Sequence, residues 1–148
     1  MKIGLSLMIV GLVVGTLGVG LRPGGRDDPL PGSIKLLEGF EHQKLQGTDS
    51  RVGKIWKEEG ITIQYDIGRL AGNYAKQQRE YQADQLLWAK QQTIKEARVE
   101  LVLKKDRELF VSFPDHSANF YGKVQTEEDL VDALLMVLTY LPAEKARR

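Results

Sequence analysis

The sequence predicts an α+β fold: an antiparallel β-meander of five to six strands with a C-terminal helix packed on one face. Three observations lead to this prediction. Apolar and polar residues alternate in several short segments, as they do in strands with one buried face. Turn-forming residues separate these segments at short intervals. The last periodic segment is a long apolar run that follows acidic residues and stops at a proline, as a helix does.

The amino-terminal segment is the most apolar part of the chain. Residues 3–21 form a run of nineteen residues without a charge, directly after Lys2. At about 1.5 Å per residue a helix of this length spans about 28 Å, close to the roughly 30 Å apolar core of a bilayer. Five glycines in the run are typical of membrane helices and would weaken a helix in a soluble core. We therefore expect residues 1–21 to be a single-pass membrane anchor, or uncleaved signal.

A cleaved signal peptide is the main alternative for the same segment. Lys2 supplies a basic start, and Gly18 and Gly20 supply small residues near a cleavage point. The apolar run is long for a signal peptide, however, and it contains no Ala-x-Ala. Cleavage would give a secreted protein. An ordinary buried helix is the third alternative, and the glycines argue against it.

The short basic head followed at once by an apolar run looks like an export start. This favours an extracytoplasmic position for the remainder of the chain. The spacing of Gly11 and Gly15 would also allow two such helices to approach closely, so a homodimer through the anchor is a further hypothesis.

A linker and one domain follow the anchor. Residues 22–33 hold three prolines and three glycines and show no periodicity, so we interpret them as a Pro/Gly linker. Residues 34–148 are long enough for a single soluble α+β domain. Three of the 21 basic and two of the 20 acidic residues precede residue 34, so the domain has 18 of each. This balance argues against a nucleic-acid partner. The chain has no cysteine, so no disulfide supports the domain.

Two hairpins are the clearest strand pairs. In residues 61–67 the side chains of Ile61, Ile63, Tyr65 and Ile67 fall on one face, and residues 52–57 precede them across a turn containing Gly60. The second hairpin joins residues 98–105 to residues 108–113. Its apolar faces carry Val99, Leu101 and Leu103 on one strand and Leu109, Val111 and Phe113 on the other.

Further elements complete the meander. Residues 39–45 and 118–124 are predicted as additional strands. Residues 73–84 are rich in helix formers and are predicted as a helix, and residues 86–94 as a strand that leads into the next hairpin. Tyr74, Tyr81 and Trp88 recur every seven residues, which favours a longer helix as the alternative.

The C-terminal helix is predicted from its cap. Thr126 and Asp129 approximate a capping box, and Pro142 ends the apolar run. The helix is apolar nearly all round, so most of its surface must be covered. We expect its inward face to carry Leu130, Leu134, Val137, Leu138 and Leu141. We expect the helix to be completely buried; the alternative is that an uncovered remainder, such as Met136 and Tyr140, forms a surface for a protein partner.

Few residues point to chemistry. His42 and His116 lack the spacing of a metal site, and no cysteine could complete one. Ser112 and Ser117 lie on either side of His116, but no Gly-x-Ser-x-Gly motif is present. We interpret Asp115 and His116 as loop residues, with a hydrolase that uses Asp66 or this loop as a third choice.

The stretch of residues 65–76 is the most particular part of the domain. It combines Asp66 with Gly68 and Gly72 and with two basic residues, Arg69 and Lys76. Such a loop can offer amides to an anion, but it lacks the Gly-Lys-Ser/Thr of a phosphate loop. The interpretation favoured is a strand-to-helix turn in which Asp66 bonds its own loop.

These observations predict a membrane-tethered, extracytoplasmic interaction or structural module without catalysis. The sequence assigns no catalytic, cofactor-binding or metal-binding residue, and no cofactor. The expected partners are the membrane, through the N-terminal helix, and a protein partner or a second copy of the chain. A small-ligand-binding domain is the alternative, with Trp56, Tyr65 or Trp88 lining an apolar pocket.

Overall fold

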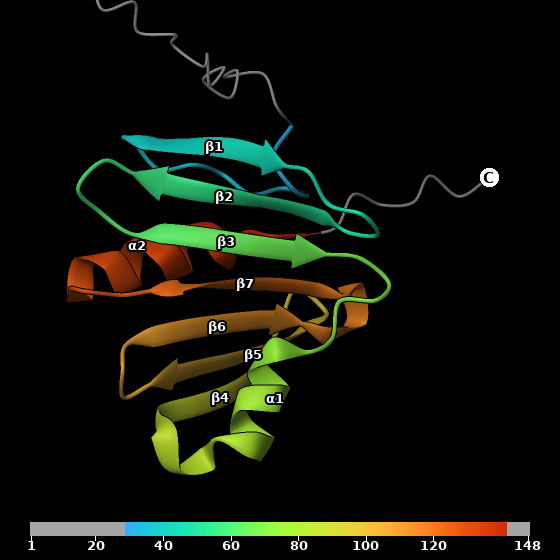
Figure 1. Ribbon diagram of the computed structural model, residues 1–148, viewed down its shortest axis with the longest axis vertical. Coiled ribbons are helices and arrows are strands. Elements are labelled where there is room, and N and C mark those ends of the chain that lie inside the picture. Colours follow the sequence, from blue (N-terminus) through green and yellow to red (C-terminus); the bar gives the residue numbers. More distant parts are fainter. Residues whose placement is uncertain (1–28, 142–148) are drawn as a thin grey trace, which may run out of the picture.

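The computed structural model describes residues 29–141, and these form one seven-stranded antiparallel sheet with a helix on each face (Figure 1). The predicted anchor, residues 1–21, lies outside the described residues. No helix within residues 29–141 is long and apolar enough to span a bilayer. The elements, in chain order, are β1 (Phe40–Leu45), β2 (Arg51–Lys57), β3 (Thr62–Ile67), α1 (Tyr74–Tyr81), β4 (Leu86–Ile94), β5 (Ala97–Lys104), β6 (Glu108–Phe113), β7 (Ala118–Lys123) and α2 (Glu127–Val137).

The sheet order is β1-β2-β3-β7-β6-β5-β4, and every neighbouring pair is antiparallel. The α+β class is confirmed, but the prediction of five to six strands in a meander is wrong in two respects. There are seven strands, because 39–45 and 86–94 both pair in the sheet. The last strand, β7, inserts between β3 and β6, so the two hairpins do not lie beside each other.

The alternating segments place their apolar residues as predicted. Ile63 and Tyr65 of β3 are buried on one face, and the apolar sets of β5 and β6 are buried with them. This face is the core, and α2 packs against it with Ala133, Met136 and Val137. In Figure 1 α2 lies behind the sheet, and α1 lies in front of it, over the end formed by β4 to β6.

The turn between β2 and β3 contains Gly60, as predicted, but the residue with positive φ in it is Glu59 (φ 56°). The two-residue turn between β4 and β5 is formed by Lys95 and Glu96, both with positive φ. This is the backbone geometry that matches the twist of a tight hairpin.

The end of the predicted linker is part of the folded domain. Pro31 is buried and Leu30 packs against the core. Ser33 bonds the chain just beyond α2: its backbone N–H donates to the Leu141 carbonyl at 3.1 Å, and its hydroxyl donates to the Thr139 carbonyl at 2.6 Å. The two ends of the described chain therefore lie together, next to the C-terminal end of α2.

The helix α2 ends earlier than predicted. Its last residue is Val137, well before Pro142, which lies outside the described residues. Beyond it the Thr139 hydroxyl donates to the Met136 carbonyl, and the Tyr140 N–H donates to the Val137 carbonyl in a tight turn. This turn directs the Tyr140 ring into the core, where it contacts Phe113 and Phe120 with ring centroids 4.9 and 5.2 Å away.

Candidate functional site

The helix α2 begins with the capping box that the sequence predicts. The Thr126 hydroxyl accepts from the Asp129 N–H at 3.1 Å, and the Asp129 carboxylate accepts from the Thr126 N–H at 3.1 Å. The same carboxylate accepts from the Gln125 N–H at 3.0 Å. Asp129 therefore caps the N-terminal end of the helix.

The inward face of α2 differs from the prediction. Met136 (0% exposed) and Tyr140 (3% exposed), the residues named as a possible partner surface, are buried in the core. Of the residues predicted to face inward, Val137 is buried, whereas Leu130, Leu134 and Leu138 are only partly buried against the core. The helix is rotated relative to the predicted orientation, because a helix that is apolar nearly all round does not reveal which side faces the sheet.

The rotation leaves an apolar surface on the outer side of α2. Val131 (53% exposed) and Leu135 (57% exposed) lie four residues apart and so occupy neighbouring positions on one helical face. Leu134 and Leu138 continue this surface toward the core. We call these four residues the α2 ridge. The other exposed large apolar residues of the described chain lie one to an element or loop.

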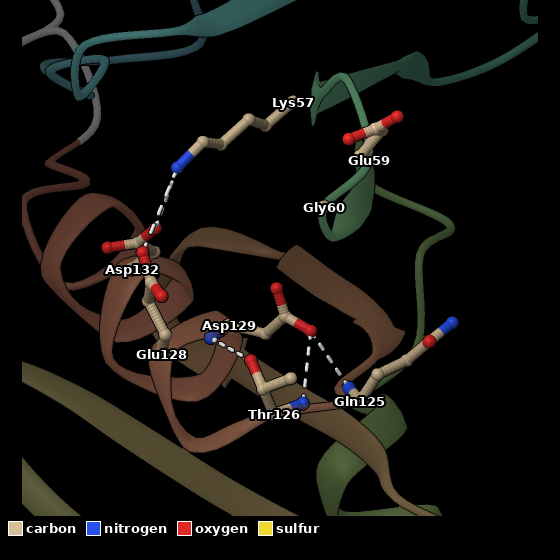
Figure 2. Close-up of a pocket in the computed structure, with 8 residues that line it drawn as sticks. All are labelled: Lys57, Glu59, Gly60, Gln125, Thr126, Glu128, Asp129 and Asp132. Atoms are coloured by element: carbon tan, nitrogen blue, oxygen red, sulfur yellow. Dashed lines mark hydrogen bonds and ion pairs between the residues drawn. The ribbon is translucent and has the colours of Figure 1, made fainter.

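The N-terminal end of the α2 ridge is acidic. The side chains of Glu127 and Glu128 are 81% and 78% exposed. Glu128 and Asp132 border a hollow of about 450 Å³ between α2 and the β2–β3 turn (Figure 2). Glu59 lines the side of the hollow that belongs to the turn.

One lysine crosses this hollow. Lys57 Nζ lies 3.9 Å from Glu128 and 4.0 Å from Asp132, at the edge of ion-pair distance. Because the carboxylates outnumber this single amine, the hollow favours cationic groups over anions. It adjoins the α2 ridge, so an apolar surface and an acidic surface lie side by side on one helix.

The prediction that Asp66 bonds its own loop is wrong. Its carboxylate accepts a hydrogen bond from the hydroxyl of Tyr74 in α1. The Tyr74 Oη donates to Asp66 Oδ2 at 2.5 Å. This hydrogen bond, together with burial and the charge of Asp66, raises the pKa of Tyr74 from 10.0 to about 12. Burial and the same charge also raise the pKa of Tyr121, whose ring lies 5.7 Å from that of Tyr74.

The Asp66–Tyr74 pair should make stability depend on pH in the alkaline range. A folded-state pKa above the unfolded value means that the neutral phenol is favoured in the folded protein. The stabilisation is complete below pH 10 and is lost as the pH rises from 10 to about 12. We expect Tyr74→Phe to be less stable than wild type at pH 8 and to approach it near pH 12, as measured by urea unfolding at each pH. A difference that is constant over this range would contradict the assignment.

The residues considered for hydrolase chemistry are held in separate structural contacts. Asp115 accepts from the Arg98 guanidinium at 2.6 Å, and this hydrogen bond lowers the pKa of Asp115. Ser112 is buried and its hydroxyl donates to Asn119 Oδ1 at 2.6 Å. Ser117 adopts a left-handed conformation (φ 47°) that connects the loop to β7. The loop around His116 is therefore shaped by structural contacts.

His42 lies on the buried face of β1. Its Nε2 is 2.9 Å from the Tyr65 hydroxyl, and the two rings stack. Within residues 29–141, no group of three or more histidines, aspartates and glutamates could hold a metal ion.

The glycine-containing loop between β3 and α1 is fixed by Asn119 of β7, a contact that the sequence did not reveal. Asn119 Nδ2 donates to the Gly72 carbonyl at 2.7 Å, and its Oδ1 accepts from the Tyr74 N–H at 3.0 Å. The next N–H of α1, that of Ala75, donates to the Ser112 hydroxyl at 3.0 Å. These contacts satisfy N–H groups of the first helical turn from the sheet below, so the loop serves to position α1.

The basic residues of the same loop are on the surface. Arg69 is exposed, and Lys76 lies 3.7 Å from Glu80 one turn along α1. The arrangement gives no support to anion binding by this loop.

The three aromatic residues proposed to line a ligand pocket do not meet. Trp56 pairs with Thr62 on the face of the sheet opposite to the core. Tyr65 is 1% exposed within the core, and Trp88 lies in β4, at the far end of the sheet. Side chains on opposite faces of one sheet cannot line a single cavity.

A shallower hollow of about 380 Å³ lies on the face of the sheet opposite to the core. Phe110 and Tyr121 border it with their rings stacked 6.2 Å apart, and Gln64 and Lys123 lie beside them.

No family model, curated protein or solved structure matches this chain. The surfaces described above are therefore the basis for proposing a function.

Proposed function

We propose that this chain is a membrane-tethered, extracytoplasmic and non-catalytic interaction module that binds a protein partner through the α2 ridge. The observation that carries the proposal is the exposure of Val131 and Leu135 on one face of a helix whose opposite face is buried in the core. Exposed apolar residues that form a continuous strip, rather than single residues, are typical of sites where proteins bind one another.

The chemistry of the partner follows from the surroundings of the ridge. Glu127 and Glu128 are exposed at the N-terminal end of α2, and the acidic hollow lies beside them. A complementary surface would carry apolar residues flanked by Lys or Arg. An amphipathic helix with a basic end fits this description, because it can lay an apolar face along α2.

The proposed membrane anchor would hold the α2 ridge close to the bilayer. The described chain begins at Pro29, and Ser33 is bonded to residues directly after α2. If residues 1–21 lie in the bilayer, residues 22–28 are the only connection, and seven residues span at most about 25 Å. The eleven residues of α2 extend about 16 Å from that point. The ridge would therefore face a partner close to the membrane surface.

If the α2 ridge binds the partner, a charge placed on the ridge should weaken that binding without unfolding the domain. Leu135→Glu should reduce co-purification of the partner from solubilised membranes at least about tenfold, since a charge would enter an apolar contact. The free energy of unfolding should change by no more than about 0.5 kcal/mol, because Leu135 is exposed.

Leu70→Glu is the matched control. Leu70 is 79% exposed on the loop between β3 and α1, away from α2, so the same change there should leave co-purification intact. Equal recovery of the partner with wild type and with Leu135→Glu would exclude the α2 ridge as the binding surface.

A small-ligand-binding domain is the alternative. The hollow beside Phe110 and Tyr121 is the observation that favours it, since stacked aromatic rings with neighbouring amides suit a flat polar ligand. It has less support than the ridge, because the predicted apolar pocket does not form.

A further inference from the structure

The strand β4 forms one end of the sheet, and its outer edge is unpaired within the described chain. It pairs with β5 on one side through eight residues, from Leu86 to Ile94, with an irregularity between Leu86 and Trp88. Residues 89–93 are all exposed. A long exposed edge offers a row of backbone N–H and carbonyl groups to another strand.

The two edges of the sheet are not equivalent. The strand β1, at the opposite end, has six residues, of which Glu41 and Lys44 are charged. The strand β4 has nine residues and a single charge, Lys90. The start of β4 carries the more exposed apolar side chain, since Leu87 is 56% exposed and Leu45, at the end of β1, is 40% exposed. These differences make β4 the edge better suited to pairing.

From these observations we propose that β4 pairs in antiparallel fashion with β4 of a second copy of this chain, joining two seven-stranded sheets into one. The register follows from the side chains. Trp88, Lys90, Gln92 and Ile94 lie opposite core-facing residues of β5, so all four point to the core side of the sheet. A two-fold axis perpendicular to the sheet keeps the core faces of both copies on the same side, so residues of one face must pair with each other.

Of the registers centred on Lys90, Gln91 or Gln92, only the one with Gln91 on the two-fold axis gives favourable side-chain pairs. With Gln91 opposite Gln91 of the second copy, Trp88 lies opposite Ile94, and Lys90 lies opposite Gln92. Aromatic residues opposite β-branched residues are favourable cross-strand pairs. A register centred on Lys90 would place two lysines directly opposite, which is unfavourable. A register centred on Gln92 would place Lys90 opposite Ile94. The charge of Lys90 therefore disfavours the registers centred on Lys90 and Gln92 and leaves the one centred on Gln91.

The interface is distinct from the α2 ridge, because β4 and α2 are different elements and the pairing needs no residue of the ridge. It is also distinct from an association of the predicted anchors through Gly11 and Gly15. A crosslink placed in β4 separates these cases, since anchors that associate do not bring β4 strands into a defined register.

Disulfide crosslinking in the full-length chain, in membranes, tests the proposal directly. The chain has no cysteine, so one introduced residue gives an unambiguous result. Directly opposite Cβ atoms of paired strands are about 4.5 to 5.5 Å apart, within reach of a disulfide. Gln91→Cys should give a covalent dimer under mild oxidation.

Thr93→Cys is the matched control, because it lies on the same face and strand but opposite Ala89 of the second copy. The two residues at position 93 would then be about 13 Å apart along the strands, so little dimer should form. Equal crosslinking at both positions, or none at Gln91→Cys, would overturn the proposal.

A second pair of variants does not depend on oxidation. Gln91→Lys would place two ammonium groups directly opposite at the two-fold axis, close to the Arg79 guanidinium of α1, so the dissociation constant of the dimer should rise at least tenfold in sedimentation measurements in detergent. Thr93→Lys would face Ala89 and should raise it less than threefold. Both side chains are exposed, so both variants should fold. Equal effects of the two variants would also contradict the register.

Discussion

Asn119→Ala is expected to lower the free energy of unfolding by about 3 kcal/mol, the largest loss that we expect from a single polar side chain. Asn119 is 1% exposed and links the loop before α1, the start of α1 and strand β6. Its removal would leave the buried Ser112 hydroxyl without its acceptor, and the partly buried Tyr74 N–H and Gly72 carbonyl without their partners. Each unsatisfied buried group costs about 1 to 3 kcal/mol. Chemical denaturation measures the loss.

The same variant should loosen α1 selectively. Hydrogen exchange of the amides of residues 74–77 should accelerate relative to those of β5 and β6, because the sheet remains intact when α1 detaches. Asn73→Ala is the matched control. Asn73 caps α1 by accepting from the Lys76 N–H at 2.9 Å, and its Nδ2 donates to Glu100 Oε1 at 3.1 Å; loss of both bonds should cost about 1 to 2 kcal/mol. A loss for Asn119→Ala no larger than that for Asn73→Ala would show that the buried network does not hold the helix.

Gly53→Ala is expected to destabilise the domain by about 2 to 3 kcal/mol through overpacking. A Cβ at Gly53 in β2 would overlap the hydroxyl and ring of Tyr65 and would lie 2.6 Å from the Gln43 carbonyl oxygen of β1. The Tyr65 side chain is buried and packs against His42. It therefore cannot move aside without disturbing the core between β1 and β3.

Gly60→Ala provides the comparison for this prediction. A Cβ at Gly60 would approach no closer than 3.2 Å to the Lys57 side chain, and Gly60 is exposed in the β2–β3 turn. Gly60→Ala should change the free energy of unfolding, measured by thermal denaturation, by no more than about 0.5 kcal/mol. If Gly53→Ala were as mild as Gly60→Ala, the close packing of β2 against Tyr65 would be disproved.

The local elements were largely predictable from the sequence. Alternation placed Ile63, Tyr65, Val99 and Val111 on buried faces, and the pairing of Thr126 with Asp129 predicted the start of α2. These patterns depend on neighbours along the chain, which a sequence shows directly.

The arrangement of the elements was not predictable in the same way. The position of β7 beside β3 depends on contacts between segments about 55 residues apart, and no periodic pattern records them. Asn119 is an example: its neighbours in β7 predicted a strand, but nothing nearby indicated that it binds the loop before α1.

The exposed side of α2 was not predictable from its sequence pattern. Met136 and Tyr140 are buried, whereas Val131 and Leu135 are exposed. Two physical reasons account for this. The apolar residues surround α2 and give no preferred side. The helix also ends at Val137, so Tyr140 follows a turn and no longer obeys helical spacing.

The most direct test of the proposed function is photo-crosslinking from position 135 of the full-length chain in intact membranes. A photoreactive amino acid at Leu135 should give an adduct with another protein, and the crosslinked peptide should carry apolar residues next to Lys or Arg. The same group at Leu70 should not give this adduct. An adduct of equal yield at both positions, or crosslinks from position 135 to lipid or to this chain alone, would contradict the account.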